Sequence, residues 1–285
     1  QVKLPVKFEF YPTLQHRGVL ILKGGFSDNI TNIDTYQHEK GRIWVKEKFE
    51  WSKPLDDEEN TEYTANIVNS FVDQSFKILS EHPINKIRAK RGLMPANIIF
   101  TRDAGIELPK LQKFWKSMAI VNMPLEKGIC SLSGMDVYSF EYPSMKNYDV
   151  YENLYNGFEK MIAFAVKTLK KRGKKYDFCY IHFKETDVPG HDNKPLEKKN
   201  MIEILDKNFF NFLKKYAEVN KIKVIVTADH STPCNLKTHT AHSVPVLFYE
   251  PSFSGDSLEF GERNSLKGSL GKIYGKNLLK KTGFH

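Results

Sequence analysis

Apolar, strand-like segments alternate with amphipathic, helix-like segments along most of the chain, and this alternation constrains the fold more than any other feature. The strand-like segments are residues 97–101, 118–123, 137–141, 178–183, 223–229 and 244–250. The helix-like segments are residues 108–117, 128–134, 151–173 and 196–220. Strands that alternate with helices predict an α/β fold, in which a mostly parallel sheet has helices on both faces. In such sheets ligands bind beyond the carboxyl ends of the strands.

The first part of the chain follows a different pattern. Residues 6–10 alternate between polar and apolar, and residues 18–25 form an apolar run that ends on paired glycines, so both are predicted strands. Residues 26–42 are predicted to be a loop. Residues 64–82 predict a long amphipathic helix. Its apolar positions include Ile67, Phe71, Phe76 and Leu79.

The composition favours a folded protein of the cytoplasm. Of the 285 residues, 40% are hydrophobic and 13% aromatic, which is typical of globular chains. The three cysteines, Cys130, Cys179 and Cys234, are too few for a disulfide framework and suit a reducing compartment. No apolar stretch approaches the roughly 20 residues of a membrane span, and no signal peptide opens the chain. We therefore expect a soluble cytoplasmic protein with no membrane partner.

The formal net charge is +9, which raises the question of a nucleic-acid partner. The basic residues are spread through the chain, and no aromatic–basic motif accompanies them. This pattern favours solvated helix faces, or attraction of a small anionic substrate, over nucleic-acid binding.

Five metal-binding side chains lie at the ends of predicted strands. Asp187 and His191 follow the strand 178–183, Asp229 and His230 lie at the end of 223–229, and His239 lies in the next loop. Carboxylate oxygen and imidazole nitrogen both bind zinc-like ions. The alternative is that these residues are loop caps and incidental surface histidines. Because all five lie at the edge where ligands bind, we favour a metal site, and two neighbouring ions would suit phosphoryl transfer.

Longer motifs resemble a known family. "TADHSTP", followed by His239 and "HSVPVLF", resembles the metal-binding end of the alkaline phosphatase superfamily. "KETDVPGH", "MPAN" and "ADHSTPCNLKTH" together resemble the archaeal type of cofactor-independent phosphoglycerate mutase, over nearly the whole chain. The resemblance implies an alkaline-phosphatase-like, mostly parallel sheet with helices on both faces, together with part of an inserted α+β lid domain.

The resemblance assigns the metal ligands. Asp187, His191 and His239 match the family's ligands of a first ion, and Asp229 and His230 match two ligands of a second. Two divalent ions are thus expected, with Mn²⁺ the first choice and Co²⁺, Zn²⁺ or Mg²⁺ as alternatives. No 2,3-bisphosphoglycerate is expected.

The resemblance also implies substrate-binding residues. Lys127, in "PLEKGI", matches a lysine between the metal site and the substrate phosphate, and Arg88 resembles a residue that contacts phosphoglycerate. Arg91 and Arg102 are weaker candidates. An exposed, solvated charge is the competing interpretation for each of these residues. The expected partner is a small phosphorylated substrate, and the question of whether the protein forms an oligomer stays open.

One departure from the family concerns the start of the chain. The family begins with a strand that leads to another aspartate ligand, and then to the serine that becomes phosphorylated; neither has a counterpart here. We interpret residues 1–60 as the remainder of the inserted substrate-covering domain, and residues 61–285 as the phosphatase-type metal-binding domain. Either an N-terminal segment is missing from this sequence, or the protein is a divergent one without its own nucleophile.

The resulting hypothesis is a metal-dependent mutase that interconverts 3-phosphoglycerate and 2-phosphoglycerate through a phosphoserine. A phosphatase or phosphonate hydrolase of the same superfamily would share every ligand. A non-catalytic metal-binding protein is the alternative if the chain truly starts at Gln1, and a nucleic-acid binder would rest on charge alone.

Overall fold

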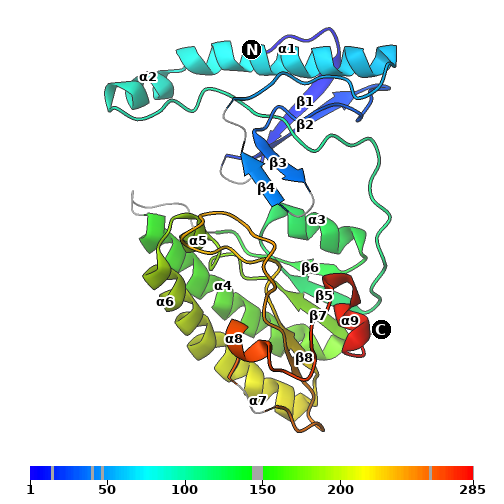
Figure 1. The fold of residues 1–285 in the computed structure, drawn as a ribbon, viewed down its shortest axis with the longest axis vertical. Coiled ribbons are helices and arrows are strands. Elements are labelled where there is room, and N and C mark those ends of the chain that lie inside the picture. The colour runs from blue at the N-terminus through cyan, green and yellow to red at the C-terminus, as the bar shows by residue number, and fades with distance from the viewer. Residues whose placement is uncertain (14–15, 40–41, 46–47, 143–149, 257–258, 285) are drawn as a thin grey trace. The chain divides into compact units, whose positions relative to one another are not determined.

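The chain forms two compact units, Gln1–Gln112 and Lys113–His285 (Figure 1). The computed structural model describes residues 1–13, 16–39, 42–45, 48–142, 150–256 and 259–284. The predicted division near residue 60 differs from the one between these units. The helix that begins at Glu59 packs on the strands before it, so it belongs to the same compact unit as they do.

The first unit contains two antiparallel hairpins. The predicted strands appear as β1 (Lys7–Pro12) and β2 (Gly18–Lys23), paired with Phe8 opposite Leu22. The second hairpin joins β3 (Tyr36–Glu39) to β4 (Arg42–Val45). The prediction of a loop over residues 26–42 is therefore wrong for residues 36–39 and for Arg42, and residues 40–41 lie outside the described part of the chain. The sequence of β3 is polar throughout apart from its tyrosine and shows no clear alternation.

The long helix α1 (Glu59–Glu81) covers the first hairpin (Figure 1). Phe71 is 2% exposed and contacts Phe8 and Phe10, with ring centroids 5.9 and 5.8 Å away. Phe76, on the same helix, is 42% exposed. Helix α2 (Pro83–Lys90) follows at once, and its first residue is a proline, which the first turn of a helix tolerates because no hydrogen bond is lost there.

The second unit contains the predicted parallel sheet. Strands β5 (Ser117–Ile120), β6 (Asp136–Tyr138) and β7 (Phe178–Ile181) pair in parallel, in the order β6-β5-β7. Strands β8 (Val224–Val226) and β9 (Leu247–Tyr249) form an antiparallel pair. The helices of this unit are α3 (Pro124–Leu132), α4 (Val150–Arg172), α5 (Val188–His191), α6 (Pro195–Leu205), α7 (Asn211–Asn220), α8 (Glu262–Ser265) and α9 (Leu278–Lys281).

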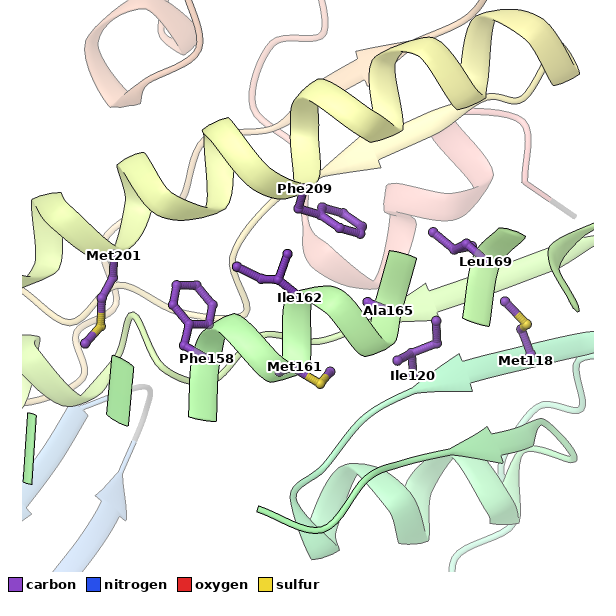
Figure 2. Packing of buried hydrophobic residues seen from close by; sticks show 9 residues of the cluster. All are labelled: Met118, Ile120, Phe158, Met161, Ile162, Ala165, Leu169, Met201 and Phe209. Atoms are coloured by element: carbon purple, nitrogen blue, oxygen red, sulfur yellow. The ribbon is translucent and has the colours of Figure 1, made fainter. Parts of the chain in front are cut away.

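Strand β5 is buried on both faces, as a central parallel strand should be. Met118 and Ile120 point to one face and pack with residues of α4, including Phe158 (Figure 2). Ala119 and the next residue, Val121, belong to a separate cluster with Cys130 of α3. This alternation follows from the two-residue period of a strand, and it places helices on opposite faces of the sheet.

Two long helices predicted in this unit are confirmed. Residues 151–173 correspond to α4, and residues 196–220 correspond to α6 and α7, joined by a π-helical turn, Asp206–Phe210. Across the described part of the chain, every helix is too short or too polar to traverse a lipid bilayer.

Two further predictions, a strand and a helix, are wrong. Residues 97–101 form no strand, although Thr101 accepts backbone hydrogen bonds from Ile33 and Asp34. Residues 108–117 contain no helix, and Trp115 is 85% exposed. This segment passes from one compact unit to the other. Phe114 stacks on Phe178, but Leu108 is 76% exposed, so the apolar side chains of this segment do not share one packed face. A short helix without a packed face is marginal in water.

Candidate metal centre

The first two candidate ligands lie beyond the carboxyl end of β7, on the short helix α5. Asp187 is the N-cap residue of α5 and His191 its last residue, so both side chains lie on one face. The carboxylate of Asp187 does not cap its own helix. It lies instead with Oδ2 3.3 Å from Nε2 of His191.

The other three candidates come from the loop after β8. An isolated antiparallel bridge pairs Ser231 with Thr240 and turns this loop back on itself. The rings of His230 and His239 consequently stack, with their centroids 3.6 Å apart. Asp229 lies beside His230, with Oδ2 3.2 Å from its Nε2.

The candidate ligands on α5 and those in the loop after β8 meet at His239. Its Nε2 lies 3.1 Å from Nε2 of His191 and 3.6 Å from Oδ1 of Asp187. Ligand atoms of Asp187, His230 and His239 also lie within 4.8 Å of one another. All five candidate residues thus form one continuous cluster, and His230, which the resemblance assigns to a second ion, contacts residues assigned to the first.

The spacing of these atoms suits a small divalent ion. Ligands bound at 2.0–2.1 Å in a tetrahedral site lie about 3.3–3.4 Å apart, because that is the edge of the tetrahedron. The Nε2 atoms of His191 and His239 lie 3.1 Å apart. Nε2 of His191 lies 3.3 Å from Oδ2 of Asp187, and Nε2 of His239 lies 3.6 Å from Oδ1 of the same carboxylate. Nitrogen and oxygen donors without cysteine favour borderline and hard ions. The residues present therefore fit a divalent metal ion.

The electrostatics keep Asp187 ionised. Burial alone would raise its pKa, but hydrogen bonds from Lys184 and Thr232 and the charges of Lys184 and His191 outweigh burial and hold the pKa well below its usual range. Burial, followed by the neighbouring charge of His230, lowers the pKa of His239. A carboxylate with a neutral imidazole is the state in which both residues bind metal.

Two residues that contact Asp187 were not predicted from the sequence. Nζ of Lys184 donates to Oδ2 at 2.6 Å, and Oγ1 of Thr232 donates to Oδ1 at 2.6 Å. Thr232 belongs to the "ADHSTP" motif, but residue spacing does not indicate where a hydroxyl group points.

Lys127 lies on α3, which follows the carboxyl end of the neighbouring strand β5. The preceding residue, Glu126, lies 3.6 Å from His182, just beyond the end of β7. The side chain of His182 is 12% exposed and faces this carboxylate. Among the residues that the structure describes, three buried side-chain atoms have no hydrogen-bond partner: Glu126 Oε2, His182 Nδ1 and Glu185 Oε2. Such atoms are rare in proteins and are common where a ligand belongs.

The three predicted substrate-binding arginines belong to the first unit. Nε of Arg88, in α2, donates to the carbonyl of Met94 at 2.9 Å, and Arg91 ends the same helix. Arg102 is paired with Asp103 at 2.7 Å and with Asp34 at 3.6 Å, which leaves it less suited to a substrate.

Comparison with known families assigns each unit. Residues 112–282, more than half of the chain, match the model of the metalloenzyme superfamily. Residues 1–85 match the model described as 2,3-bisphosphoglycerate-independent phosphoglycerate mutase. The two matches fall on the two compact units.

Individual relatives carry the same description. The 2,3-bisphosphoglycerate-independent phosphoglycerate mutase of Thermococcus kodakarensis is 34% identical over 98% of this chain, and that of Methanosphaera stadtmanae is 36% identical over 98%. The chain spans 64% and 65% of the lengths of these two relatives.

A solved structure supports the fold. The PH0037 protein of Pyrococcus horikoshii superposes on this chain with a TM-score of 0.58 and 32% identity, covering 79% of this chain and 58% of that protein. The fold is therefore the α/β, alkaline-phosphatase-like fold predicted from the sequence. The chain belongs to the metalloenzyme superfamily, whose members bind divalent metal, and is a homologue of the 2,3-bisphosphoglycerate-independent phosphoglycerate mutases.

Proposed function

We propose that this chain is the greater part of a metal-dependent phosphoglycerate mutase, which interconverts 3-phosphoglycerate and 2-phosphoglycerate through a phosphoserine. The observation that carries the proposal is the convergence of Asp187, His191 and His239 in a chain whose relatives are phosphoglycerate mutases. The activity needs no 2,3-bisphosphoglycerate and belongs in the cytoplasm, in glycolysis and gluconeogenesis.

Asp187, His191 and His239 are proposed to hold one ion, and Asp229 and His230 to hold part of a second. Mn²⁺ is the first choice, with Co²⁺, Zn²⁺ and Mg²⁺ as alternatives. Bound divalent ions neutralise the charge of a phosphate and polarise its oxygens. The contact between His230 and His239 supports two neighbouring ions, because it joins the two ligand sets.

Lys127 is proposed to bind the transferring phosphate. Its helix starts at the same sheet edge as the ligands, and its half-buried position would restrain the ammonium group. Arg88 and Arg91, with Arg102 as a weaker candidate, are proposed to bind the phosphate or carboxylate of phosphoglycerate, since arginine pairs with both.

The first unit is proposed to cover the substrate, with residues 1–60 as the remainder of the inserted domain and α1 packed on them. A cover matters because water that reaches a phosphoenzyme turns a mutase into a phosphatase. The nucleophilic serine is proposed to lie in a segment that corresponds to the part of the relatives outside the match with this sequence.

The test compares two products. The protein as its gene encodes it, loaded with Mn²⁺, is given 3-phosphoglycerate; formation of 2-phosphoglycerate is measured with enolase, and inorganic phosphate is measured in parallel. We expect 2-phosphoglycerate without stoichiometric phosphate release. Phosphate release without isomerisation would establish the rival phosphatase instead.

The same assay tests Lys127. Replacing it with alanine should lower turnover by about 10²-fold or more, because a charge-stabilising donor is lost at the reacting phosphate. Lys160→Ala, an exposed lysine on α4, is the matched control and should leave turnover unchanged. Equal turnover in both variants would remove Lys127 from the site.

A further inference from the structure

The hydroxyl group of Thr232 joins the loop after β8 to the start of helix α5. Thr232 is 4% exposed, and its Oγ1 donates to Oδ1 of Asp187, 45 positions earlier, at 2.6 Å. The same oxygen lies 3.1 Å from Nδ1 of His230. One buried side chain thus contacts a candidate ligand on each side.

Counting hydrogens places a hydrogen on Nδ1 of His230. A hydroxyl carries a single hydrogen, and an ionised carboxylate only accepts. The hydrogen of Thr232 is therefore used by Asp187, and Oγ1 must accept from Nδ1–H of His230. In the neutral ring this leaves a lone pair on Nε2, the atom that lies nearest Asp229.

His191 is fixed in the same way. Its Nδ1 lies 3.1 Å from the carbonyl oxygen of Lys237, and a carbonyl only accepts. The hydrogen must again lie on Nδ1, so that Nε2 presents its lone pair to Asp187 and His239. Both histidines thus direct the same nitrogen into the cluster.

The backbone of Thr232 is held from two further elements. Gly190 of α5 lies so close that an added Cβ would be 2.6 Å from the carbonyl oxygen of Thr232 and 2.9 Å from its Cγ2. Nζ of Lys198, on α6, donates to that carbonyl at 2.8 Å. Thr232 therefore has little freedom to move away from Asp187.

We propose that Thr232 is a positioning residue of the metal centre, which holds the carboxylate of Asp187 in place and selects the Nδ1–H tautomer of His230. The inference rests on the metal site of the proposed function. Partners that orient metal ligands in this way contribute about 10–100-fold to metal affinity.

The first experiment measures Mn²⁺ affinity by competition with a chromophoric chelator. Thr232→Val keeps the shape and removes the hydroxyl, so affinity should fall about 10–100-fold. Thr232→Ser restores the hydroxyl and should restore affinity to near the wild-type value. Thr282→Val is the control, because that buried hydroxyl bonds only to carbonyls of its own helix α9. Equal affinity in wild type and Thr232→Val would overturn the proposal.

The second experiment needs no metal. ¹⁵N NMR of the metal-free protein at a pH where His230 is neutral should show the Nδ1–H tautomer, and Thr232→Val should shift the population toward Nε2–H. Should Thr232→Val fail to fold, Thr232→Cys, with a weaker donor, takes its place. Wild-type protein in the Nε2–H form would overturn the role of Thr232 whatever the metal result. Wild-type protein that binds no Mn²⁺ yet has the Nδ1–H tautomer would overturn the proposed metal site alone.

Discussion

At the scale of single residues, the candidate ligands and their hydrogen-bond partners have separate tasks. Asp187 supplies a carboxylate that two donors hold ionised, and His191 and His239 supply nitrogen atoms within 3.6 Å of it. The ligands should therefore be individually necessary, since an ion that loses one of three protein ligands loses charge and geometry together.

His191→Ala and His239→Ala should each lower the metal content of the purified protein, measured by elemental analysis after equilibration with Mn²⁺. His242→Ala is the control, because His242 is exposed and bonds to Thr240 instead of to the cluster. Unchanged stoichiometry in both ligand variants would refute the assignment.

Gly190 provides a test of close packing at the centre. Gly190→Ala should reduce the free energy of unfolding by about 1–3 kcal/mol, because the new Cβ meets backbone that must shift. Gly128→Ala, in α3, meets nothing within 4 Å and should raise stability by up to about 1 kcal/mol, as alanine favours the helix. Urea unfolding measures both, and equal shifts in the two variants would contradict the close contact with Thr232.

At the scale of elements, the periodicity of the sequence predicted which helices exist better than it predicted what they pack against. The pattern of α4 placed that helix within a residue of its observed bounds, because its buried positions recur at helical spacing around Phe158. The same reasoning failed for residues 108–117, where Phe114 packs on Phe178 but Leu108 and Trp115 stay exposed. Local sequence does not specify which surfaces of the folded protein a segment can pack on, and for this reason periodicity alone predicted a helix that does not form.

The faces of α1 give a prediction at this scale. Phe71 and Phe76 looked equivalent in the sequence, but only Phe71 is buried against the first hairpin. Phe71→Ala should destabilise the protein by about 3–5 kcal/mol, whereas Phe76→Ala should cost about 0.5 kcal/mol or less. Chemical unfolding distinguishes the two, and similar losses would mean that α1 packs on a different face.

The sequence predicted which residues form the candidate cluster, and their role as metal ligands stays a prediction. Asp187, His191, Asp229, His230 and His239 could be named because each follows a predicted strand, and parallel strands bring their carboxyl ends together. The contacts of Thr232, Lys184 and Lys198 could not, because they depend on side-chain directions in loops that no periodicity describes.

At the scale of the whole molecule, the phosphoglycerate mutase model matches the first compact unit and the metalloenzyme model matches the second. All of the protein ligands assigned to the first ion lie in the second unit. The resemblance assigns only Asp229 and His230 to the second ion, and the remaining aspartate to a segment that this sequence does not match.

Residues 1–285 prepared alone should therefore bind one Mn²⁺ or Co²⁺ well and a second weakly, because the second ligand set is incomplete. They should show no turnover of 3-phosphoglycerate and at most slight hydrolysis of p-nitrophenyl phosphate. Mass spectrometry verifies the chain, circular dichroism verifies its folding, and calorimetry counts the ions. Robust turnover by the verified chain would mean that one of its own residues replaces the serine.

The meeting of His191 and His239 has a consequence for the lifetime of the protein. These residues are 48 positions apart, so an ion bound by both acts as a cross-link across that span. A covalent link of comparable length removes about 4 kcal/mol of chain entropy from the unfolded state, and a bound ion stabilises according to its free concentration. When the free concentration of the ion in the cell falls, the protein should first lose its activity. Its free energy of unfolding should fall as well, so that more of the protein unfolds and is degraded.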